Sequence, residues 1–299
     1  MWLMWTLVKT FGVPVALAVL ITACERDIDV TPPVTVAAAP PAAEQFAAVQ
    51  SSSGGESRVY GTYTRGCIAG AQQLPLEAVH WQVLNPARNR AWGHPGLIRF
   101  IRLLAAGVAS DGFRGVLVGD LAQPRGGPLP SDHNSHQVGL DADIWLTPLP
   151  ARKLSAGQLE TFEPPSMVDV STLRVNALFG AAQVSLLKRA AQAPGVERIF
   201  VSPPIKQALC ARAAGQAWLQ KIRPWRGHMA HMHVRMACPV DSDDCKDQEP
   251  PPDGDGCGAE LASWFKDTSW KREGSTPYAP EKAMRLDVLP AQCRQLLRG

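Results

Sequence analysis

The sequence has little net charge, no HExxH motif and no CxxC pair, and each absence excludes a class of protein. The formal net charge is +3 over 299 residues, which is too small to indicate a nucleic-acid partner. Without HExxH, the helix-based arrangement of many zinc peptidases is excluded. Without CxxC, a metal site built from cysteines is disfavoured. The hydrophobic content of 45% is ordinary for a globular protein with a buried core.

Long apolar runs are also missing, and the apolar run at the N-terminus has the pattern of an export signal. Lys9 precedes VPVALAVLITA, a run shorter than the roughly 20 residues of a transmembrane helix. The letters ITAC, ending at Cys24, resemble a lipobox, in which the cysteine is lipidated after cleavage. We therefore predict a lipoprotein signal peptide at residues 1–23, a lipid anchor on Cys24, and a flexible Pro- and Ala-rich tether at 24–57. The alternative is an ordinary signal peptide with an incidental cysteine.

Apart from Cys24, the chain has an even number of cysteines. Paired cysteines are typical of exported proteins, where disulfides persist. Many pairings are compatible with this number, and the spacing alone does not choose among them. The cysteines are Cys67, Cys210, Cys238, Cys245, Cys257 and Cys293.

Five of the seven histidines lie in two distant segments, SDHNSHQVGLDADIW at 131–145 and WRGHMAHMHVRMACP at 225–239. His231 and His233 are two apart in a β-prone run, so both imidazoles face the same side of a strand. Two imidazoles and a carboxylate are typical ligands of a catalytic zinc ion, with one position left for water. His136, Asp143 and His233 could supply them. By spacing alone, a polar surface cluster is an equal alternative.

Both segments resemble the signature segments of the penicillin-insensitive murein endopeptidases, which are LAS-type zinc metallopeptidases related to the Hedgehog-like fold. The resemblance extends from Tyr60 to Arg298, and further segments resemble the family in the same order: GTYTRGCIAGAQQLP, RNRAWGHPGLIRFI, GVLVGDLAQPRGG, RIFVSPPIKQALC and DGCGAELASWF. It implies zinc ligation by His136, Asp143 and His233. It also implies disulfides between Cys67 and Cys293, Cys210 and Cys257, and Cys238 and Cys245.

The resemblance places the other histidines of these two segments beside the ion. His231 is expected to act as general base or transition-state stabiliser, and its alternative role is to orient its neighbour. His228 is a second candidate for proton transfer, although in a regular strand it would face away from His233 unless the chain bends. His133 corresponds to a position associated with a second metal in the family. Because no histidine lies between His136 and His228, we predict a single zinc, with His133 next to its ligands or in contact with substrate.

Two aspartates, Asp169 and Asp141, also have expected roles at the site. Asp169 is the candidate to replace the aspartate of the second metal site. Asp141 is expected to hold an imidazole in one tautomer rather than to bind the ion.

Strand and helix patterns are mixed around the proposed site. Helical spacing covers 95–110, 181–194 and 207–222, and strand patterns cover 115–121 and the runs ADIWLT, ERIFVSPP and HMHVRMAC. We therefore predict an α+β fold: one LAS/Hedgehog-like metallopeptidase domain with an antiparallel sheet, stabilised by disulfides. Its expected limits are 58–245 for the catalytic domain and 246–299 for an irregular C-terminal extension packed on it.

The resemblance implies a zinc-dependent endopeptidase that hydrolyses D-alanyl-meso-diaminopimelyl cross-links in peptidoglycan and is insensitive to β-lactams. Such a protein would act in the periplasm, anchored by its lipid to the inner or outer membrane. One alternative is a LAS-type D,D-carboxypeptidase or dipeptidase that trims stem peptides. Another is an inactive lipoprotein that only binds peptidoglycan.

Overall fold

The computed structural model describes residues 39–111, 113–131, 133–266 and 284–298. The predicted signal peptide and Cys24 lie outside these ranges. Among the residues described, no helix is both long and apolar enough to span a bilayer.

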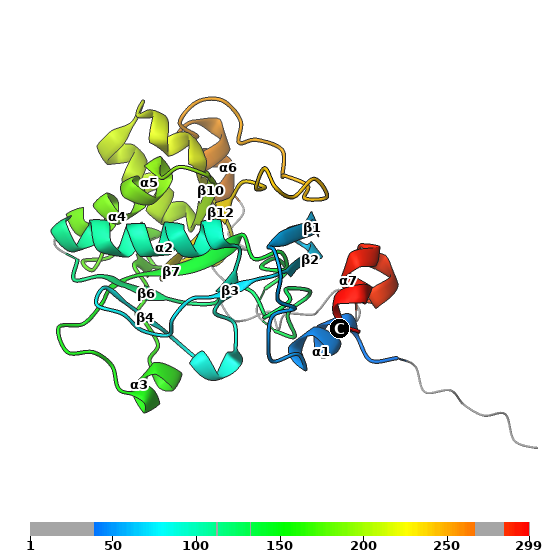
Figure 1. Cartoon of the computed structure of the whole chain (residues 1–299). Coiled ribbons are helices and arrows are strands. Elements are labelled where there is room, and N and C mark those ends of the chain that lie inside the picture. Colours follow the sequence, from blue (N-terminus) through cyan, green and yellow to red (C-terminus); the bar gives the residue numbers. More distant parts are fainter. Residues whose placement is uncertain (1–38, 112, 132, 267–283, 299) are drawn as a thin grey trace, which may run out of the picture. The chain divides into compact units, whose positions relative to one another are not determined.

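The chain contains both helices and strands, and its first five strands precede α2 (Figure 1). The helices are α1 (Ala42–Ala47), α2 (Pro95–Val108), α3 (Ala156–Thr161), α4 (Ala181–Gln192), α5 (Pro203–Ala213), α6 (Ala259–Lys266) and α7 (Ala291–Leu296). The strands are β1 (Arg58–Thr62), β2 (Arg65–Ala69), β3 (Gln72–Gln73), β4 (Trp81–Val83), β5 (Trp92–Gly93), β6 (Val116–Val118), β7 (Asp141–Pro148), β8 (Val168–Asp169), β9 (Arg174–Val175), β10 (Val196–Val201), β11 (Ile222–Pro224) and β12 (His231–Met236).

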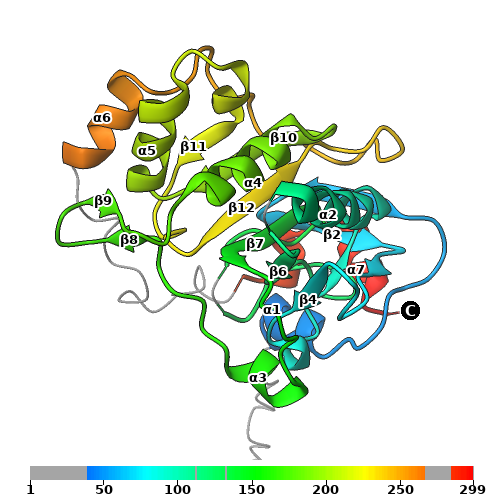
Figure 2. The same ribbon diagram turned by 90° about the vertical axis from the view of Figure 1, so that its left-hand side faces the viewer.

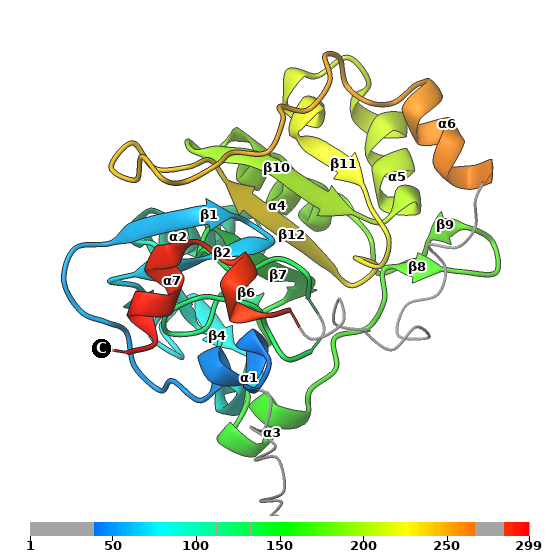
Figure 3. The same cartoon turned by 90° about the vertical axis from the view of Figure 1, so that its right-hand side faces the viewer.

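A six-stranded sheet in the order β11-β10-β12-β7-β6-β4 forms the centre of the fold (Figure 3). Its four inner strands are antiparallel, and each edge strand is parallel to its neighbour. The prediction of an α+β fold is confirmed, but the antiparallel pattern does not extend to the edges. The reason is connectivity: α2 connects β4 to β6 and α5 connects β10 to β11, and a helical crossover returns the chain in its original direction.

Helices α2 and α4 pack side by side against one face of this sheet (Figure 2). Alternate residues of β7 point to that face, so Ala142, Ile144 and Leu146 join the main hydrophobic core. The alternate residues Asp141, Asp143 and Trp145 point to the opposite face. Strand alternation therefore separates the packing residues of the sheet from those that can carry chemistry.

The start of α2 and the end of α5 are each explained by particular residues. For α2, Pro95 occupies the first turn and the His94 Nδ1 accepts the Gly96 N–H at 3.1 Å, as expected for a helix start. The predicted helix at 207–222 is instead α5, which begins earlier at Pro203, followed by a short 3-10 turn at Ala217–Lys221. Gly215 lies between them with φ +79°, a left-handed conformation that ends a helix.

Helix α1 lies within the segment predicted to be a tether and packs against the rest of the domain, so the prediction is wrong for residues 42–47. Phe46 of α1 is fully buried in a small core with the Cys67–Cys293 pair and Leu289. The Ala42 N–H also donates to the Met284 carbonyl at 2.9 Å. Burying a phenylalanine is worth about 1.5–3 kcal/mol, which favours a fixed position for α1 beside α7 (Figure 1).

All three expected disulfides are present: Cys67–Cys293, Cys210–Cys257 and Cys238–Cys245. Two of them, Cys67–Cys293 and Cys210–Cys257, connect residues beyond 246 to earlier parts of the chain, whereas Cys238–Cys245 closes a local loop. Within 246–299, the regular elements among the described residues include α6 and α7.

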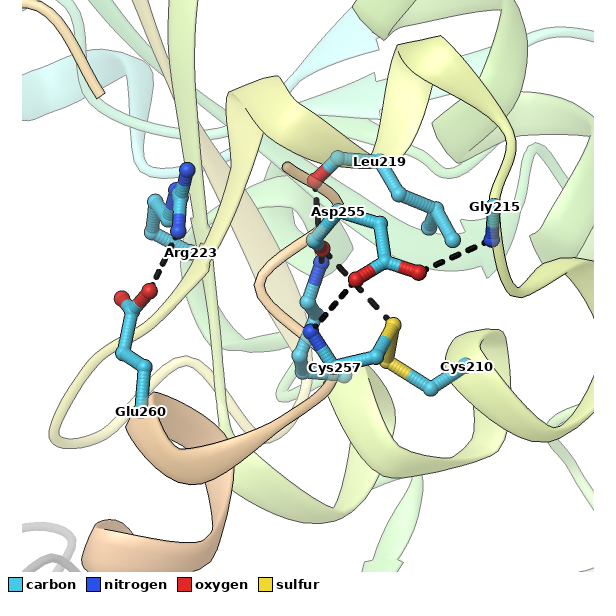
Figure 4. The surroundings of a disulfide bond; sticks show 8 residues. Cys210, Gly215, Leu219, Arg223, Asp255, Cys257 and Glu260 are labelled. Carbon is cyan, nitrogen blue, oxygen red and sulfur yellow. Dashed lines mark hydrogen bonds and ion pairs between the residues drawn. A yellow bond between two sulfur atoms is a disulfide. The ribbon is translucent and has the colours of Figure 1, made fainter. Parts of the chain in front are cut away.

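The surroundings of the Cys210–Cys257 disulfide fix α6 against α5 and β11 (Figure 4). The Asp255 carboxylate accepts the N–H groups of Gly215 at 2.8 Å and Cys257 at 2.9 Å. Arg223 of β11 forms an ion pair with Glu260 of α6. Nearby, the buried Lys206 donates to the Leu219 carbonyl at 2.9 Å. Burial, together with the positive charge of Arg223, lowers the pKa of Lys206 to about 8.

Candidate metal centre

The predicted metal ligands are brought together by the pairing of β7 with β12. His233 lies directly opposite Asp143, and His231 opposite Trp145, so these side chains share the sheet face away from α2 and α4. His136 comes from the loop that precedes β7, and its φ of +65° is a left-handed conformation that is rare outside glycine. Strained backbone of this kind is concentrated at functional sites.

Gly139 makes the turn between His136 and Asp143 possible. Its φ is +68°, and a Cβ at this position would lie 2.9 Å from Ile68 Cδ1 and 3.1 Å from Gly93 Cα. A larger residue would therefore be strained by its backbone and would push the loop away from its neighbours. The glycine allows the chain to return into β7 with both side chains on the same side.

Three donor atoms converge at this position. The His136 Nε2 is 3.2 Å from the His233 Nδ1 and 3.5 Å from the Asp143 Oδ1, and the latter two atoms are 3.2 Å apart. All three residues are buried. Zinc–ligand bonds of about 2.0–2.2 Å in tetrahedral geometry place ligand atoms at about these separations. The donor set therefore fits a zinc ion without rearrangement.

The electrostatics of Asp143 also fit a cation. Its Oδ1 is buried and has no hydrogen-bond partner among the residues described, which is costly for a carboxylate. Burial alone would raise the pKa of Asp143, but the imidazoles of His136 and His231 hold it well below its usual range. Asp143 is therefore a buried carboxylate whose Oδ1, the atom nearest His136 and His233, has no hydrogen-bond partner among the described residues, as expected for an atom that binds a cation.

Asp141 orients His233, as the spacing predicted. Its Oδ1 is 3.0 Å from the His233 Nε2, and the Arg235 Nε donates to the same oxygen at 2.8 Å. The other oxygen accepts the His136 N–H at 3.0 Å. Burial opposes the imidazolium of His233, but Asp141 and then Asp143 raise the pKa of His233 to about 9. A carboxylate on Nε2 leaves Nδ1 directed at the site.

Arg235 connects this arrangement to the C-terminal extension. Its Nη1 donates to the Gln248 Oε1 at 2.7 Å, and its guanidinium lies over the Tyr63 ring, 4.1 Å from the centroid. The Tyr63 hydroxyl is in turn 3.0 Å from the Asp247 Oδ1. Residues beyond the predicted domain boundary at 245 therefore support Asp141, the carboxylate that contacts His233.

Two further imidazoles complete the site. The His231 Nε2 is 3.8 Å from the Asp143 Oδ1, and its ring contacts Trp145. Gly227 and His228 both have positive φ, 65° and 58°, and this bend brings the His228 ring to 4.8 Å from that of His231. Burial lowers the pKa of His231 to about 4 and that of His228 well below its usual value. Both rings are therefore neutral at neutral pH.

His133 lies next to the candidate ligands but faces another carboxylate, that of Asp120. Its Nε2 is 3.1 Å from the Asp120 Oδ2 and 3.6 Å from the Asp143 Oδ2. His133, His136 and Asp143 offer ligand atoms within 4.8 Å of one another, a looser group than the set that includes His233. Burial opposes the charge on His133, but Asp143 and Asp120 raise its pKa.

Asp120 is the site residue that the sequence did not reveal. The backbone holds it beside Asp143, whose N–H donates to the Asp120 carbonyl at 3.1 Å. The Asp120 Oδ2 accepts from Arg90 at 2.8 Å and Arg88 at 3.2 Å. Burial raises the pKa of Asp120, but His133 and Arg90 outweigh that effect and lower it to about 2. The signal in the sequence was a polar residue placed directly after the buried run GVLVG.

Asp169, the candidate for a second metal site, is occupied elsewhere. Its Oδ1 accepts the N–H of Ser171 at 2.8 Å and the hydroxyl of the same residue at 2.6 Å. It therefore closes its own turn between β8 and β9, and Asp120 is the carboxylate that pairs with His133.

A pocket of about 420 Å³ opens beside the converging donors. Asp120, Asp143, His133 and His231 line it, together with Trp145. Other contributing residues come from the turn near η1 (Pro86–Arg88), from the end of β6, and from α3 and the chain after it: Asn85, Arg88, Gly119, Glu160, Thr161, Phe162, Glu163 and Pro164. The volume is at the lower end of that of small-molecule sites and is sufficient for part of a peptide.

Comparison with known proteins agrees with this geometry. A family model described as penicillin-insensitive murein endopeptidase matches residues 59–298. A protein of that name from Pectobacterium atrosepticum is 46% identical over 245 residues, which cover 81% of this chain and 85% of the relative. One from Yersinia enterocolitica is 44% identical, with 81% and 86% covered. One from Klebsiella pneumoniae is 43% identical over 258 residues, with 86% and 92% covered. The chain therefore belongs to the penicillin-insensitive murein endopeptidases, a family of metallopeptidases.

Proposed function

We propose that the protein is a zinc-dependent murein endopeptidase that hydrolyses D-alanyl-meso-diaminopimelyl cross-links in the periplasm. The observation that carries the proposal is the convergence of the His136 Nε2, the His233 Nδ1 and the Asp143 Oδ1 to within 3.2–3.5 Å of one another. These three residues would hold the zinc ion. When bound, zinc polarises a carbonyl and lowers the pKa of water to near 7.

In this proposal His231 moves the proton. It lines the pocket, and its depressed pKa of about 4 leaves it neutral and able to accept a proton from the attacking water. After peptide-bond cleavage it can return this proton to the leaving amine. Protonation would also place a positive charge close to Asp143, which stabilises it.

His228 assists His231 in this proposal. Its Nδ1 is 2.6 Å from the Arg226 carbonyl, so Nδ1 carries the hydrogen and Nε2 is the free acceptor. The His228 ring lies 4.8 Å from the His231 ring, a distance that suits a residue that orients His231 or relays a proton to it. His133, held by Asp120, forms a pocket wall that contacts substrate.

This chemistry needs no serine nucleophile, so β-lactams have no acyl-enzyme to form. The defining experiment incubates the enzyme with cross-linked muropeptide dimers in the presence of EDTA or penicillin. We expect EDTA to abolish cleavage, zinc to restore it and penicillin to have no effect. Full activity after exhaustive chelation would remove the zinc mechanism.

Product analysis and metal content separate the alternatives. Release of D-alanine from monomeric stems, with dimers left intact, would identify a D,D-carboxypeptidase, and sacculus binding without products would identify an inactive lipoprotein. Mass spectrometry of the purified protein should find one zinc per chain, and His233→Ala should lose it. The lipid on Cys24 is tested by membrane fractionation of Cys24→Ala, which we expect to release the enzyme into the soluble periplasm.

A further inference from the structure

A row of aromatic rings leads away from the metal centre. Phe200 of β10 is 5.5 Å from the His233 ring and 6.3 Å from the His228 ring, measured between centroids. Trp225, which directly follows β11, is 5.6 Å from Phe200, and Trp264 of α6 is 5.9 Å from Trp225. We call Phe200, Trp225 and Trp264 the aromatic shelf. None of the three lines the pocket beside the metal centre.

Trp225 presents the open surface of this shelf. Its residue exposure is 51%, although burying aromatic surface is favourable by about 25 cal/mol per Å². The position is fixed, because the Trp225 N–H donates to the Val201 carbonyl at 2.8 Å and extends the register of the sheet. Behind it, α6 is held by the Cys210–Cys257 disulfide and the ion pair between Arg223 and Glu260 (Figure 4). The shelf is therefore rigid and prearranged.

Trp225 lies within the reach of a murein stem whose end is at the metal centre. The two centroid distances through Phe200 place Trp225 no more than about 11 Å from the His233 ring. A stem of three or four extended residues spans about 10–14 Å at 3.3–3.6 Å per residue. In murein each stem peptide is attached to a sugar of the glycan strand, so a sugar follows the scissile bond at this distance on both sides.

The chemistry of the substrate selects the sugar as the ligand. Stem residues offer methyl, carboxylate and ammonium groups, none of which has a broad apolar face. A pyranose ring does have one, formed by its axial C–H bonds, and the face of a tryptophan is the matching surface. We propose that Trp225, supported by Phe200 and Trp264, stacks against a sugar ring of the glycan strand that carries the cleaved stem. This inference rests on the proposed murein endopeptidase function.

The test compares two soluble substrates that differ only in their sugars. One is a cross-linked muropeptide dimer with its disaccharides, and the other is the same dimer after enzymatic removal of the sugars. We expect Trp225→Ala to raise KM for the sugar-bearing dimer about three- to tenfold, as loss of one aromatic contact implies, with kcat unchanged. The sugar-free dimer should be cleaved as by the wild type, which also shows that the variant is folded.

Two variants serve as controls. Trp225→Tyr keeps an aromatic face and should retain most of the affinity. Leu103→Ala removes an apolar side chain that is 66% exposed on α2, on the other face of the sheet, and should change neither KM. An equal rise in KM for both dimers would place the peptide on Trp225 and overturn the proposal, as would the absence of any change.

Binding without turnover separates this proposal from the function on which it rests. Peptide-free glycan strands contain no bond for an endopeptidase to cut, so their affinity for the intact protein can be measured by calorimetry. We expect Trp225→Ala to weaken this binding by the same factor as it raises KM. If the wild type cleaves no dimer but Trp225→Ala weakens its binding to glycan, the catalytic proposal fails and the proposal of sugar stacking on Trp225 is kept. If the wild type and the variant bind glycan equally, the stacking proposal is overturned.

Discussion

Replacing Asp141 by asparagine tests whether the buried carboxylate, rather than the fold alone, prepares His233 for a metal. Asparagine has the same shape, but it removes the negative charge that faces both the His233 Nε2 and the Arg235 Nε, at 3.0 and 2.8 Å. Loss of such a partner typically costs 10–100-fold in metal affinity, or about 1.4–2.7 kcal/mol. We therefore expect the zinc dissociation constant of Asp141→Asn to rise by one to two orders of magnitude.

The same change has a second, separable effect on stability. Arg235 and Asp141 are both buried, and removing one partner of a buried ion pair costs about 3–5 kcal/mol. Competition with a chromophoric chelator measures the zinc affinity, and urea unfolding of the metal-free protein measures the stability. The matched control is Asp111→Asn, which breaks the more exposed ion pair with Arg189 and should leave zinc affinity unchanged. A folded Asp141→Asn protein with wild-type zinc affinity would refute the reasoning.

Three further predictions concern other parts of the molecule. Phe46→Ala should lower the free energy of unfolding by about 3–5 kcal/mol, while the exposed Glu44→Gln changes it by less than about 0.5 kcal/mol; equal effects in thermal melts would contradict the packing of α1. The pKa of Lys206 is about 8 in the folded protein and 10.5 ordinarily, so between these pH values the unfolded chain binds more protons than the folded one. The free energy of unfolding should therefore rise by about 3 kcal/mol from pH 8 to 10.5 and stay level below pH 8. Urea titrations at each pH should show this rise for the wild type and not for Lys206→Met. His133→Ala should keep one zinc per chain by mass spectrometry, whereas loss of the metal would make His133 an essential ligand.

The sequence predicted the candidate ligands His136, Asp143 and His233, and the structure brings their donor atoms together. His231 and His233 share a strand face by the two-residue period alone, and the turn at Gly139 explains why His136 and Asp143 meet. The resemblance to the family then supplied the pairing of the two segments, which no local pattern contains. Asp120 was not predictable in the same way, because its place depends on the pairing of β6 with β7.

Departures from the predictions also have local causes. A Pro- and Ala-rich segment was interpreted as a tether, but the single aromatic residue Phe46 is enough to dock α1 into the core around Cys67 and Cys293. For His228, the strand pattern predicted an outward ring unless the chain bends. The positive φ at Gly227 and His228 supplies that bend. In the sequence, Gly227 was the only residue that indicated a bend at this position.

The contacts of Arg235 have a consequence for how this enzyme can be dissected. Gln248 holds its guanidinium, and Asp247 holds the tyrosine beneath it, so a fragment that stops at residue 245 would lose the brace behind His233. Such a fragment would retain every histidine of the site and still be expected to hold its ion poorly. Asp247 and Gln248 therefore support the candidate metal centre from behind His233, so the C-terminal extension and the histidine site form one functional unit.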